Sequence, residues 1–319
     1  MVPSVNRTPI PFVIGMDVGG SKIRMARVTM RGRILGSVME QRVISRRKHS
    51  LIRQVAGMVR GMAAAGRGHP QAVGIGVPGF LLKESGVIYA SPNFPSWHLM
   101  PFRSLLRSSL CFPLAVENDA NAAALGEAWK GRGRNVKTML YLGLGTGVGG
   151  GVVLNGRLLH GSDGLAGELG HITVDPHGPI CGCGNSGCLE AYASATAIVR
   201  AYLEVKRGRR KAPPTAAELS RAARAGDKAA REVFIGAGKA LGIAIASLIN
   251  IFNPQTVVIG GGVAEAWDLF APAMKAQLVW RAIRPARLSA RVVRGILGDR
   301  AGILGAAAVA WQGKGVEIF

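Results

Sequence analysis

The sequence predicts an α/β protein built from two related lobes. Short apolar strands alternate with helical patterns along the whole chain, as in α/β folds. A strand that ends in glycines and leads into a second strand occurs twice, at residues 12–29 and 139–154. The length of 319 residues suffices for about two domains. Two lobes with a cleft between them are therefore the simplest arrangement, since ligands of such folds gather at strand ends.

The first half of the chain begins with three consecutive strands at hairpin spacing. These are the runs FVIGMDVGG, KIRMARVTM and GRILGSVME. A helical pattern follows and ends at Gly66, and the next buried strand ends at Pro78-Gly79. After a short helix over FRSLLRSSL, the strand PLAVEND leads into the alanine-rich helix ANAAALGEAWKG.

The second half begins with the same strand–turn–strand pattern. The run TMLYLGLGTGVGGGVVLNGRLLHG contains a strand, a glycine-rich turn, a second strand, an Asn155-Gly156 turn and a third strand. Asn-Gly between apolar runs is a strong hairpin signal. Helices are expected near 194–207, 215–225 and 227–252, followed by the strand TVVIGGG and a final helix over GILGAAAVAW.

The chain is strongly basic, with a formal net charge of +22. Basic clusters at 45–50, 130–134 and 206–211 could neutralise the phosphates of a nucleic acid. They lie far apart in the sequence, however, and no aromatic residues alternate with them as base stacking requires. We therefore expect solvated basic loops and no specific nucleic-acid partner.

Membrane and secreted classes are not favoured by the sequence. The longest apolar run, residues 241–252, is too short to span a bilayer. The first fifteen residues contain no continuous apolar segment of the kind that a signal peptide needs. Three of the four cysteines are crowded together, so there is no disulfide framework. We expect a cytoplasmic protein without a membrane partner.

Three glycine-rich turns follow predicted strands. The first, DVGGSK at 17–22, could bring backbone N–H groups to phosphate oxygens, or it could be an ordinary hairpin. The second, GLGTGVGG at 143–150, is a further candidate for binding phosphate. The third, IGGG at 259–262, is a weaker candidate. The second turn contains a formal G-x-G-x-x-G, but a hairpin follows it instead of a helix, which excludes a dinucleotide-binding dehydrogenase.

Two further segments carry candidate chemistry. In ENDAN, at 117–121, Asn118 or Asp119 could cap the following helix, or Asp119 could accept a proton from a hydroxyl nucleophile. The second segment, residues 167–192, holds Cys181, Cys183 and Cys188. This cluster could be a redox site, a structural metal site or part of an active site.

The motifs in combination resemble the ROK family of sugar kinases and repressors. DVGGSK, GVPG, ENDANAAALGE, LGTGVGGG, GELGH and CGCGNSGCLE occur in this order, and the resemblance covers roughly residues 12–312. It implies the two-lobed actin-like (RNase H-like) ATPase fold, with sugar and ATP bound in the cleft between the lobes. The expected lobes are 12–115, completed by the helix near 301–312, and 116–300, which includes a zinc site.

Within the family the chain is most similar to bacterial ATP-dependent glucokinases. The resemblance thus implies a homodimeric enzyme that uses Mg-ATP to phosphorylate the 6-hydroxyl of glucose, with Asp119 as the catalytic base. The implied sugar-binding residues are Gly79, Asn93, Asn118, Asp119, Glu168, His171 and Glu190. The implied ATP-binding residues are Asp17, Gly19, Gly20, Ser21, Lys22, Gly145, Thr146, Gly147, Gly260, Gly261 and Gly262. Ser21 stands where the family more often has Thr, and it keeps the hydroxyl.

The resemblance also assigns the cysteine cluster. The family places a structural zinc on His171, Cys181, Cys183 and Cys188, a Cys₃His set that suits tetrahedral Zn²⁺. A Cys181–Cys183 disulfide would be strained, and the redox motif C-x-x-C is absent. We expect the metal to hold Glu168 and Glu190 for binding sugar hydroxyls. Cys111, outside the cluster, is expected in the core.

Two alternatives remain. One is a sugar-responsive ROK repressor, which we disfavour because only 11 residues precede the first strand and such repressors carry an N-terminal winged helix-turn-helix. The other is a kinase of the same fold acting on N-acetylmannosamine, N-acetylglucosamine or fructose. The sequence discriminates poorly among these sugars, and it does not distinguish ATP from polyphosphate as the phosphoryl donor.

Overall fold

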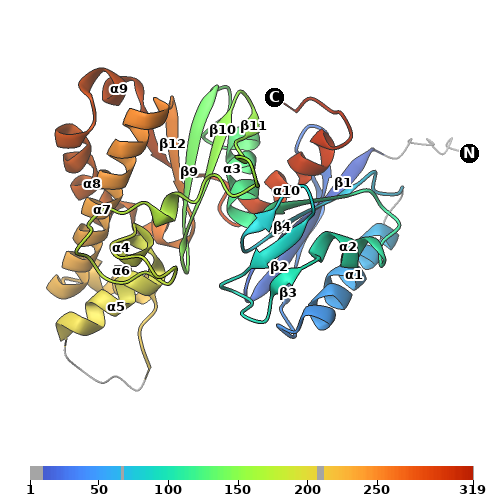
Figure 1. Cartoon of the computed structure of the whole chain (residues 1–319), viewed down its shortest axis with the longest axis horizontal. Helices are drawn as coiled ribbons and strands as arrows, with labels where there is room; N and C mark the ends of the chain where they lie inside the picture. Colours follow the sequence, from blue (N-terminus) through green and yellow to red (C-terminus); the bar gives the residue numbers. More distant parts are fainter. Residues whose placement is uncertain (1–9, 66–67, 207–211, 319) are drawn as a thin grey trace, which may run out of the picture. The chain divides into compact units, whose positions relative to one another are not determined.

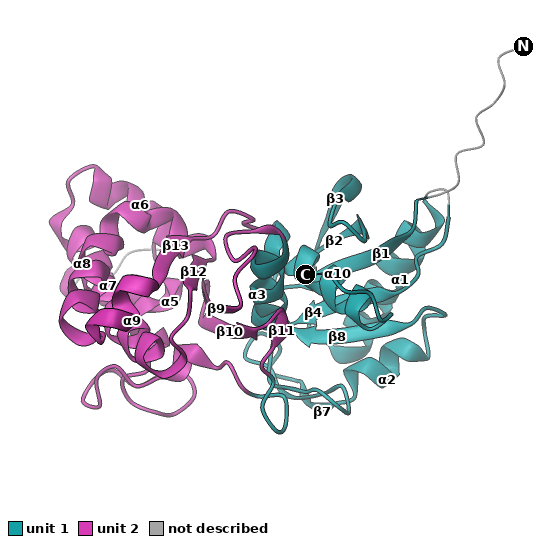
Figure 2. Ribbon diagram, turned by 90° about the horizontal axis from the view of Figure 1, so that it is seen from above, with its two compact units in different colours: residues 1–129, 160–165, 300–319 teal, residues 130–159, 166–299 magenta. Residues whose placement is uncertain are grey.

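The computed structural model describes residues 10–65, 68–206 and 212–318 (Figure 1). The expected helix end at Gly66, the first nine residues and the basic cluster from 207 to 211 lie outside these ranges. The chain divides into two compact units (Figure 2). Unit 1 comprises residues 1–129, 160–165 and 300–319, and unit 2 comprises residues 130–159 and 166–299. Each unit has its own five-stranded sheet and its own hydrophobic core.

The sheet of unit 1 has the strand order β3-β2-β1-β4-β8. The first three strands form two antiparallel pairs, as their hairpin spacing predicted, and β4 and β8 run parallel to β1. Residues of β1 and β4 are almost all buried, which explains their continuous apolar sequences. The five strands are β1 (Phe12–Val18), β2 (Lys22–Thr29), β3 (Ile34–Arg42), β4 (Val73–Val77) and β8 (Leu114–Asn118).

Four helices complete the described part of unit 1, and the C-terminal one packs directly on the sheet. They are α1 (Lys48–Ala64), α2 (Phe102–Arg107), α3 (Asp119–Lys130, whose last residue the division assigns to unit 2) and α10 (Arg300–Gln312). Gly15 and Gly74 permit the close packing, since a Cβ atom on Gly74 would lie 1.8 Å from the carbonyl oxygen of Ala306. A Cβ on Gly126 of α3 would likewise lie 2.2 Å from the Ala301 oxygen. Helix α3 therefore packs with unit 1, although the lobe boundary expected from the sequence lies before this helix, at 115/116.

A small second sheet in unit 1 was not expected from the sequence. Its strands are β5 (Leu81–Leu82), β6 (Val87–Ala90) and β7 (His98–Met100), which pair in that order. Strands this short leave little periodicity to detect. The stacked rings of Phe94 and Trp97, with centroids 4.1 Å apart, belong to the core beside this sheet.

The sheet of unit 2 repeats the topology of the first, with the order β11-β10-β9-β12-β13. Again three strands pair antiparallel, and the last two run parallel to the first strand of the unit. The repeated glycine-ended strand pattern thus correctly predicted two related lobes. The strands are β9 (Thr138–Leu144), β10 (Val148–Leu154), β11 (Arg157–Leu158), β12 (Thr256–Gly260) and β13 (Arg291–Arg294).

The helices of unit 2 pack mainly around α7. They are α4 (Glu190–Ala193), α5 (Ala195–Lys206), α6 (Ala216–Arg224), α7 (Lys228–Phe252), α8 (Trp267–Arg281) and α9 (Arg284–Ser289), with short 3₁₀ turns at Leu169–His171 and Gly262–Ala266. Within the described part of the chain, α7 alone is long and apolar enough to cross a membrane. Since 61% of its most apolar window is buried inside the protein, it has the character of a core helix.

Candidate active site

The first glycine-rich turn joins β1 to β2 in unit 1. The Gly19 N–H donates to the Lys22 carbonyl at 2.8 Å and closes the turn. Asn93, a predicted sugar-binding residue, lies against Gly20, where a Cβ atom would come within 2.8 Å of its Nδ2 atom. The Lys22 ammonium lies 2.6 Å from Glu40 Oε1, so its charge is compensated in this arrangement. The turn therefore offers backbone N–H groups and the Ser21 hydroxyl to a ligand.

The ENDAN segment forms the junction between β8 and α3. Asn118 caps the helix, because its Oδ1 accepts the backbone N–H groups of Ala120 at 2.9 Å and Asn121 at 3.0 Å. Its Nδ2 donates to the Gly79 carbonyl at 3.1 Å, which brings two predicted sugar-binding residues together. Gly79 has φ +120°, and a Cβ there would lie 2.5 Å from the Ala90 oxygen. The expected capping role thus belongs to Asn118, which leaves the Asp119 carboxylate available for chemistry.

Asp119 is the first residue of α3 and is half-buried. Its Oδ1 accepts the Ala120 N–H at 2.8 Å. Burial raises the pKa of the Asp119 carboxyl to about 6, although hydrogen bonds from neighbouring backbone N–H groups act in the opposite direction. A carboxylate with this pKa is mostly ionised at neutral pH and is more basic than an exposed one. Such a group suits general-base catalysis.

The raised pKa of Asp119 leads to a prediction about pH. Only the ionised carboxylate can accept a proton, so kcat/KM for the hydroxyl substrate should rise with pH and level off above an apparent pKa near 6. The measurement is a pH profile at saturating Mg-ATP, with the thermal unfolding temperature recorded at each pH as a control for folding. A profile that stays flat down to pH 5 in folded protein would contradict the role of Asp119 as base.

The second glycine-rich turn, in unit 2, is held by Glu190. Glu190 Oε2 accepts the Val148 N–H at 2.8 Å. A Cβ atom on Gly147 would lie 2.3 Å from the same oxygen, so a side chain there would displace the Glu190 carboxylate. The third turn adjoins the second, because Gly260 of β12 is paired with Gly143 of β9. The structure thereby brings the two predicted ATP-binding turns of unit 2 together and places Glu190 against the second of them.

The cysteine cluster lies beside Glu190 in the same unit. One ligand atom each from His171, Cys181, Cys183 and Cys188 can be chosen so that all four lie within 4.8 Å of one another. Cys181 Sγ lies 3.7 Å from His171 Nδ1, and Cys183 Sγ lies 3.7 Å from Cys188 Sγ. Backbone hydrogen bonds close the loop locally, for example from the Cys181 N–H to the Asn185 carbonyl at 2.8 Å.

This geometry fits a tetrahedral metal site. A Zn–S bond of about 2.3 Å places two sulfur ligands of a tetrahedral ion about 3.8 Å apart, close to the observed separation. Burial raises the pKa of the Cys181 thiol to about 12, so its thiolate needs a cation beside it at neutral pH. His171 Nε2, on the other side of the ring, lies 4.0 Å from Glu168 Oε2. The cluster is compatible with structural zinc, with one nitrogen of His171 facing the sulfurs and the other facing Glu168.

One expectation about the cysteines was wrong. Cys111 is exposed, not part of the core, because it lies in the loop that follows α2. Sequence reasoning also missed Glu117, a buried carboxylate directly before Asn118, and its partners Lys83 and His160. The acidic residue in ENDAN was visible in the sequence, but nothing there indicated partners 34 and 43 residues away.

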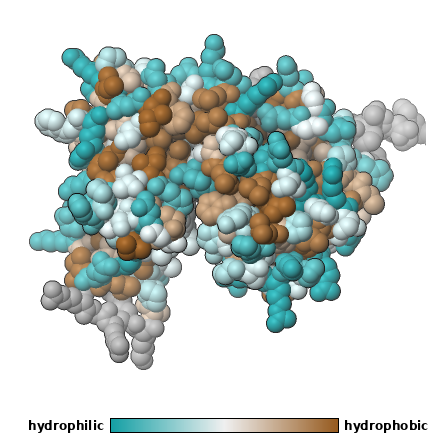
Figure 3. All heavy atoms as spheres, in the orientation of Figure 1, coloured by the Kyte–Doolittle hydropathy of each residue, from teal (hydrophilic) through white to brown (hydrophobic). Residues whose placement is uncertain are grey.

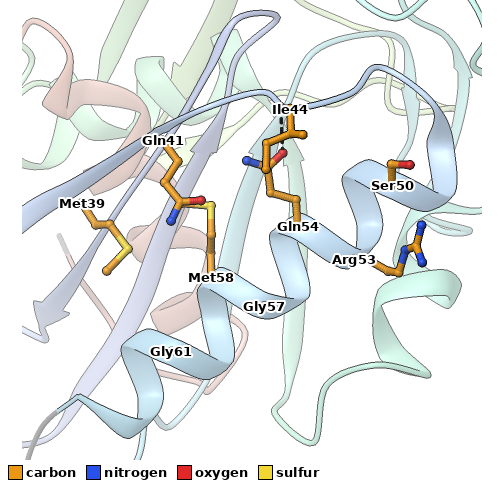
Figure 4. A pocket seen from close by; sticks show the side chains of 9 residues that line it. All are labelled: Met39, Gln41, Ile44, Ser50, Arg53, Gln54, Gly57, Met58 and Gly61. Atoms are coloured by element: carbon orange, nitrogen blue, oxygen red, sulfur yellow. Dashed lines mark hydrogen bonds between the residues drawn. The ribbon is translucent and has the colours of Figure 1, made fainter.

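The predicted site residues form two groups, one in each unit. The group in unit 1 comprises Asp17, Gly19, Gly20, Ser21, Lys22, Gly79, Asn93, Asn118 and Asp119. The group in unit 2 comprises Gly145, Thr146, Gly147, Glu168, His171, Cys181, Cys183, Cys188, Glu190 and Gly260 to Gly262. A surface pocket of about 470 Å³ between β3 and α1 contains none of them (Figure 4).

Comparison with known proteins identifies the family. The ROK family model matches residues 13–313. The chain belongs to the ROK family. A glucokinase from Thermotoga maritima is 40% identical over 308 residues, which are 93% of this chain and 96% of the relative.

Two solved structures of the family are similar over nearly the whole chain. The ROK hexokinase from Thermus thermophilus has a TM-score of 0.83 and 36% identity, covering 95% of this chain and 99% of its own. The ROK glucokinase from Streptomyces griseus, solved with glucose and AMPPNP, has a TM-score of 0.79 and 32% identity, covering 94% and 99%. The ROK membership and these neighbours confirm the expected two-lobed actin-like fold.

Proposed function

We propose that this protein is an ATP-dependent sugar kinase that converts glucose to glucose 6-phosphate. The observation that carries the proposal is Asp119, a half-buried carboxylate with a pKa of about 6 at the start of α3, in a chain of the ROK family. Support for glucose comes from the similarity to glucokinases, one of them solved with glucose and a nucleotide analogue.

Asp119 acts as the general base in this proposal. It accepts the proton of the 6-hydroxyl while the hydroxyl oxygen attacks the γ-phosphorus of ATP. The new O–P bond forms as the bond between the γ-phosphorus and the bridging oxygen breaks, and ADP leaves. The N–H group of Ala120 keeps the carboxylate oriented, since it binds one of its two oxygens.

The glycine-rich turns bind ATP. Backbone N–H groups of Gly20 and of the second turn approach the phosphates, while the Gly19 N–H shapes the first turn by donating to the Lys22 carbonyl. Gly260 to Gly262 contribute on the nucleotide side. Asp17 would hold the Mg²⁺ ion, which would supply positive charge to neutralise the phosphates. A Cβ on Gly302 would lie 2.8 Å from Asp17 Cγ, so the N-terminal end of α10 packs closely against this carboxylate.

The remaining residues bind the sugar. Gly79, Asn93 and Asn118 in unit 1, and Glu168, His171 and Glu190 in unit 2, hydrogen-bond its hydroxyl groups. His171 and the three cysteines would hold a structural zinc, which would fix the last three in place. The closeness of Cys181 Sγ to Glu190 Oε1, at 3.6 Å, and of His171 to Glu168 supports this role.

We predict a preference for glucose over N-acetylated hexosamines. A site built around sugar hydroxyls rejects analogues that leave its buried polar groups unpaired. We expect kcat/KM for glucose to exceed that for N-acetylmannosamine at least about tenfold, a difference of roughly 1.4 kcal/mol in transition-state binding. The measurement is a competition between the two sugars at limiting concentrations, extended to N-acetylglucosamine and fructose. A preference for one of the other sugars would keep the kinase assignment and change the substrate.

The repressor alternative makes a different prediction about DNA. If the basic surface is only solvated, DNA binding should be weak, indifferent to sequence and lost steeply as salt increases. Fluorescence anisotropy with labelled duplexes, over a range of salt concentrations, measures this. Sub-micromolar binding to one defined site at physiological salt, released by a sugar, would favour the repressor.

A homodimer in the cytoplasm is also part of the proposal. On the face drawn in Figure 3, apolar and hydrophilic side chains are interspersed. In unit 2, the side chains of Ile251, Trp280 and Ile283 are 70%, 85% and 61% exposed. Ile283 lies close to Ile251, because its N–H donates at 2.9 Å to Oδ1 of Asn250, the residue before Ile251. Apolar side chains this exposed could be buried against a second copy. Sedimentation equilibrium measures the oligomeric state.

A further inference from the structure

A buried carboxylate without a part in the proposed reaction directly precedes Asn118 and Asp119. Glu117, near the end of β8, is only 2% exposed. Its Oε2 accepts hydrogen bonds from Lys83 Nζ and, at 2.9 Å, from His160 Nε2. Burial alone would raise the pKa of Glu117, but the hydrogen bond from His160 and the charge of Lys83 outweigh it and hold the pKa below the usual value. Glu117 is therefore ionised at neutral pH and depends on these two donors.

The other oxygen of Glu117 holds the residues around Asp119. Oε1 accepts the backbone N–H of Asn118 at 3.0 Å and Nδ2 of Asn121 at 3.4 Å. Asn118 and Asn121 are themselves joined by the cap of α3, in which Asn118 Oδ1 accepts the Asn121 N–H. Asp119 lies between these two residues in the chain. A change in the orientation of the Glu117 carboxylate would therefore move Asn118 and Asn121, and Asp119 with them.

The donor His160 belongs to a short segment with an unusual place in the chain. Residues 160–165 are part of unit 1, although the residues on both sides of them belong to unit 2. We call these six residues the strap. Its first residue, His160, is hydrogen-bonded to Glu117, and Gly164, near its other end, packs closely against Leu81 of β5 and Lys83 just after it.

Gly164 fits this place because it has no side chain. Its φ is +92°, and a Cβ atom would lie 2.8 Å from the backbone nitrogen of Lys83 and 2.9 Å from the Leu81 oxygen. Lys83, against which the strap packs, donates to the Val116 carbonyl at 3.2 Å as well as to Glu117. The strap, Lys83 and Glu117 are thus one connected network, and the strap continues into Gly167 and Glu168.

We propose that His160, Lys83 and Glu117 are positioning residues, through which the strap fixes the Asp119 carboxylate for proton transfer. The inference rests on the proposed function, because it acts through Asp119. Loss of the His160 donor leaves the buried Glu117 carboxylate with one hydrogen-bond partner fewer on Oε2. The carboxylate then rotates, and its Oε1 no longer holds Asn118 and Asn121 in the same position. A displacement of about 1 Å at a reacting group can cost on the order of 10²-fold in rate.

The first test compares His160→Leu with His160→Gln in the full-length protein. Leucine removes the donor, whereas the glutamine amide can still donate to Glu117. We expect His160→Leu to lower kcat on glucose about 10- to 100-fold with the KM for ATP changed less than about threefold, and His160→Gln to keep kcat within about threefold of wild type. A general loss of stability would not lower kcat while leaving the KM for ATP nearly unchanged, and glutamine would not restore kcat. These two results therefore distinguish a positioning role from a loss of stability.

The second test detaches the strap without changing any side chain of the network. Gly164→Ala places a methyl group against Lys83, and we expect kcat on glucose to fall in the same way. Gly315→Ala is the matched control, since Gly315 in unit 1 also has a positive φ, +75°, but has open space around its Cβ position. It should retain the wild-type kcat. This pair decides the question if His160→Leu does not fold.

Two results would overturn the inference. One is a kcat within twofold of wild type for folded His160→Leu or Gly164→Ala. The other is a His160→Gln variant as impaired as His160→Leu, since the hydrogen-bond donor would then be irrelevant. Failure of the wild-type protein to phosphorylate glucose would instead refute the proposed function, so the two failures are distinguishable in one assay.

Discussion

Replacing Asp119 with asparagine should lower kcat for glucose phosphorylation by a factor on the order of 10² to 10⁴. The amide has the size of the carboxyl group, and its oxygen can still accept the Ala120 N–H that Asp119 Oδ1 now accepts. It cannot accept a proton from the 6-hydroxyl. We therefore expect glucose binding, measured by calorimetry, to persist while turnover in a coupled ADP assay is nearly lost.

A second aspartate at a helix start provides the control for Asp119→Asn. Asp227 caps α7 and accepts the Ala230 N–H at 3.1 Å, and it lies outside both groups of site residues. Asp227→Asn keeps the capping oxygen and should leave kcat close to the wild-type value. Near-normal turnover of a correctly folded Asp119→Asn protein would remove Asp119 from the chemistry and leave it only a role in helix structure.

Loss of the metal site should have the second-largest effect. Purified protein should contain about one zinc per chain, and Cys188→Ser should remove it. We expect the thermal unfolding temperature to fall by ~10 °C, since loss of a metal site can cost about 4 kcal/mol and each kcal/mol shifts it by roughly 2–4 °C at this size. Glucose binding should weaken at the same time, because Glu190 lies beside Cys181 and also holds the Val148 N–H of the second turn.

Cys111→Ser is the matched control for the metal site. Cys111 is exposed and lies in unit 1, outside the cluster, so this variant should keep its zinc, its stability and its sugar affinity. Metal content is measured by atomic emission, and stability by calorimetry. Zinc-free protein with full activity would refute the claim that the metal positions the sugar-binding carboxylates.

Much of the fold was predictable because it follows from local patterns. The glycine-ended strands, the Asn155-Gly156 turn and the 3.6-residue periodicity of α7 each depend on residues close together in the sequence. The two sheets of identical order follow from the repeated pattern. The metal cluster was also accessible, because its three cysteines lie within eight residues and His171 lies only ten residues before Cys181.

What the sequence did not predict depends on contacts between distant segments. Glu117 binds Lys83 and His160 across 34 and 43 residues, and no periodicity connects them. The packing of α3 on α10, which assigns most of α3 to unit 1, joins Gly126 to Ala301. The exposure of Cys111 depends on the loop that follows α2, whereas a free cysteine outside the metal cluster was expected in the core.

The proposed reaction is tested most directly by its stoichiometry. Purified wild-type protein is incubated with glucose, ATP and Mg²⁺, and ADP and glucose 6-phosphate are quantified in the same samples by ³¹P NMR. We predict equal amounts of the two products, with the phosphate on the 6-hydroxyl, and none when glucose or ATP is left out. Release of ADP without a phosphorylated sugar, or no turnover of glucose by folded, zinc-loaded protein, would contradict the assignment.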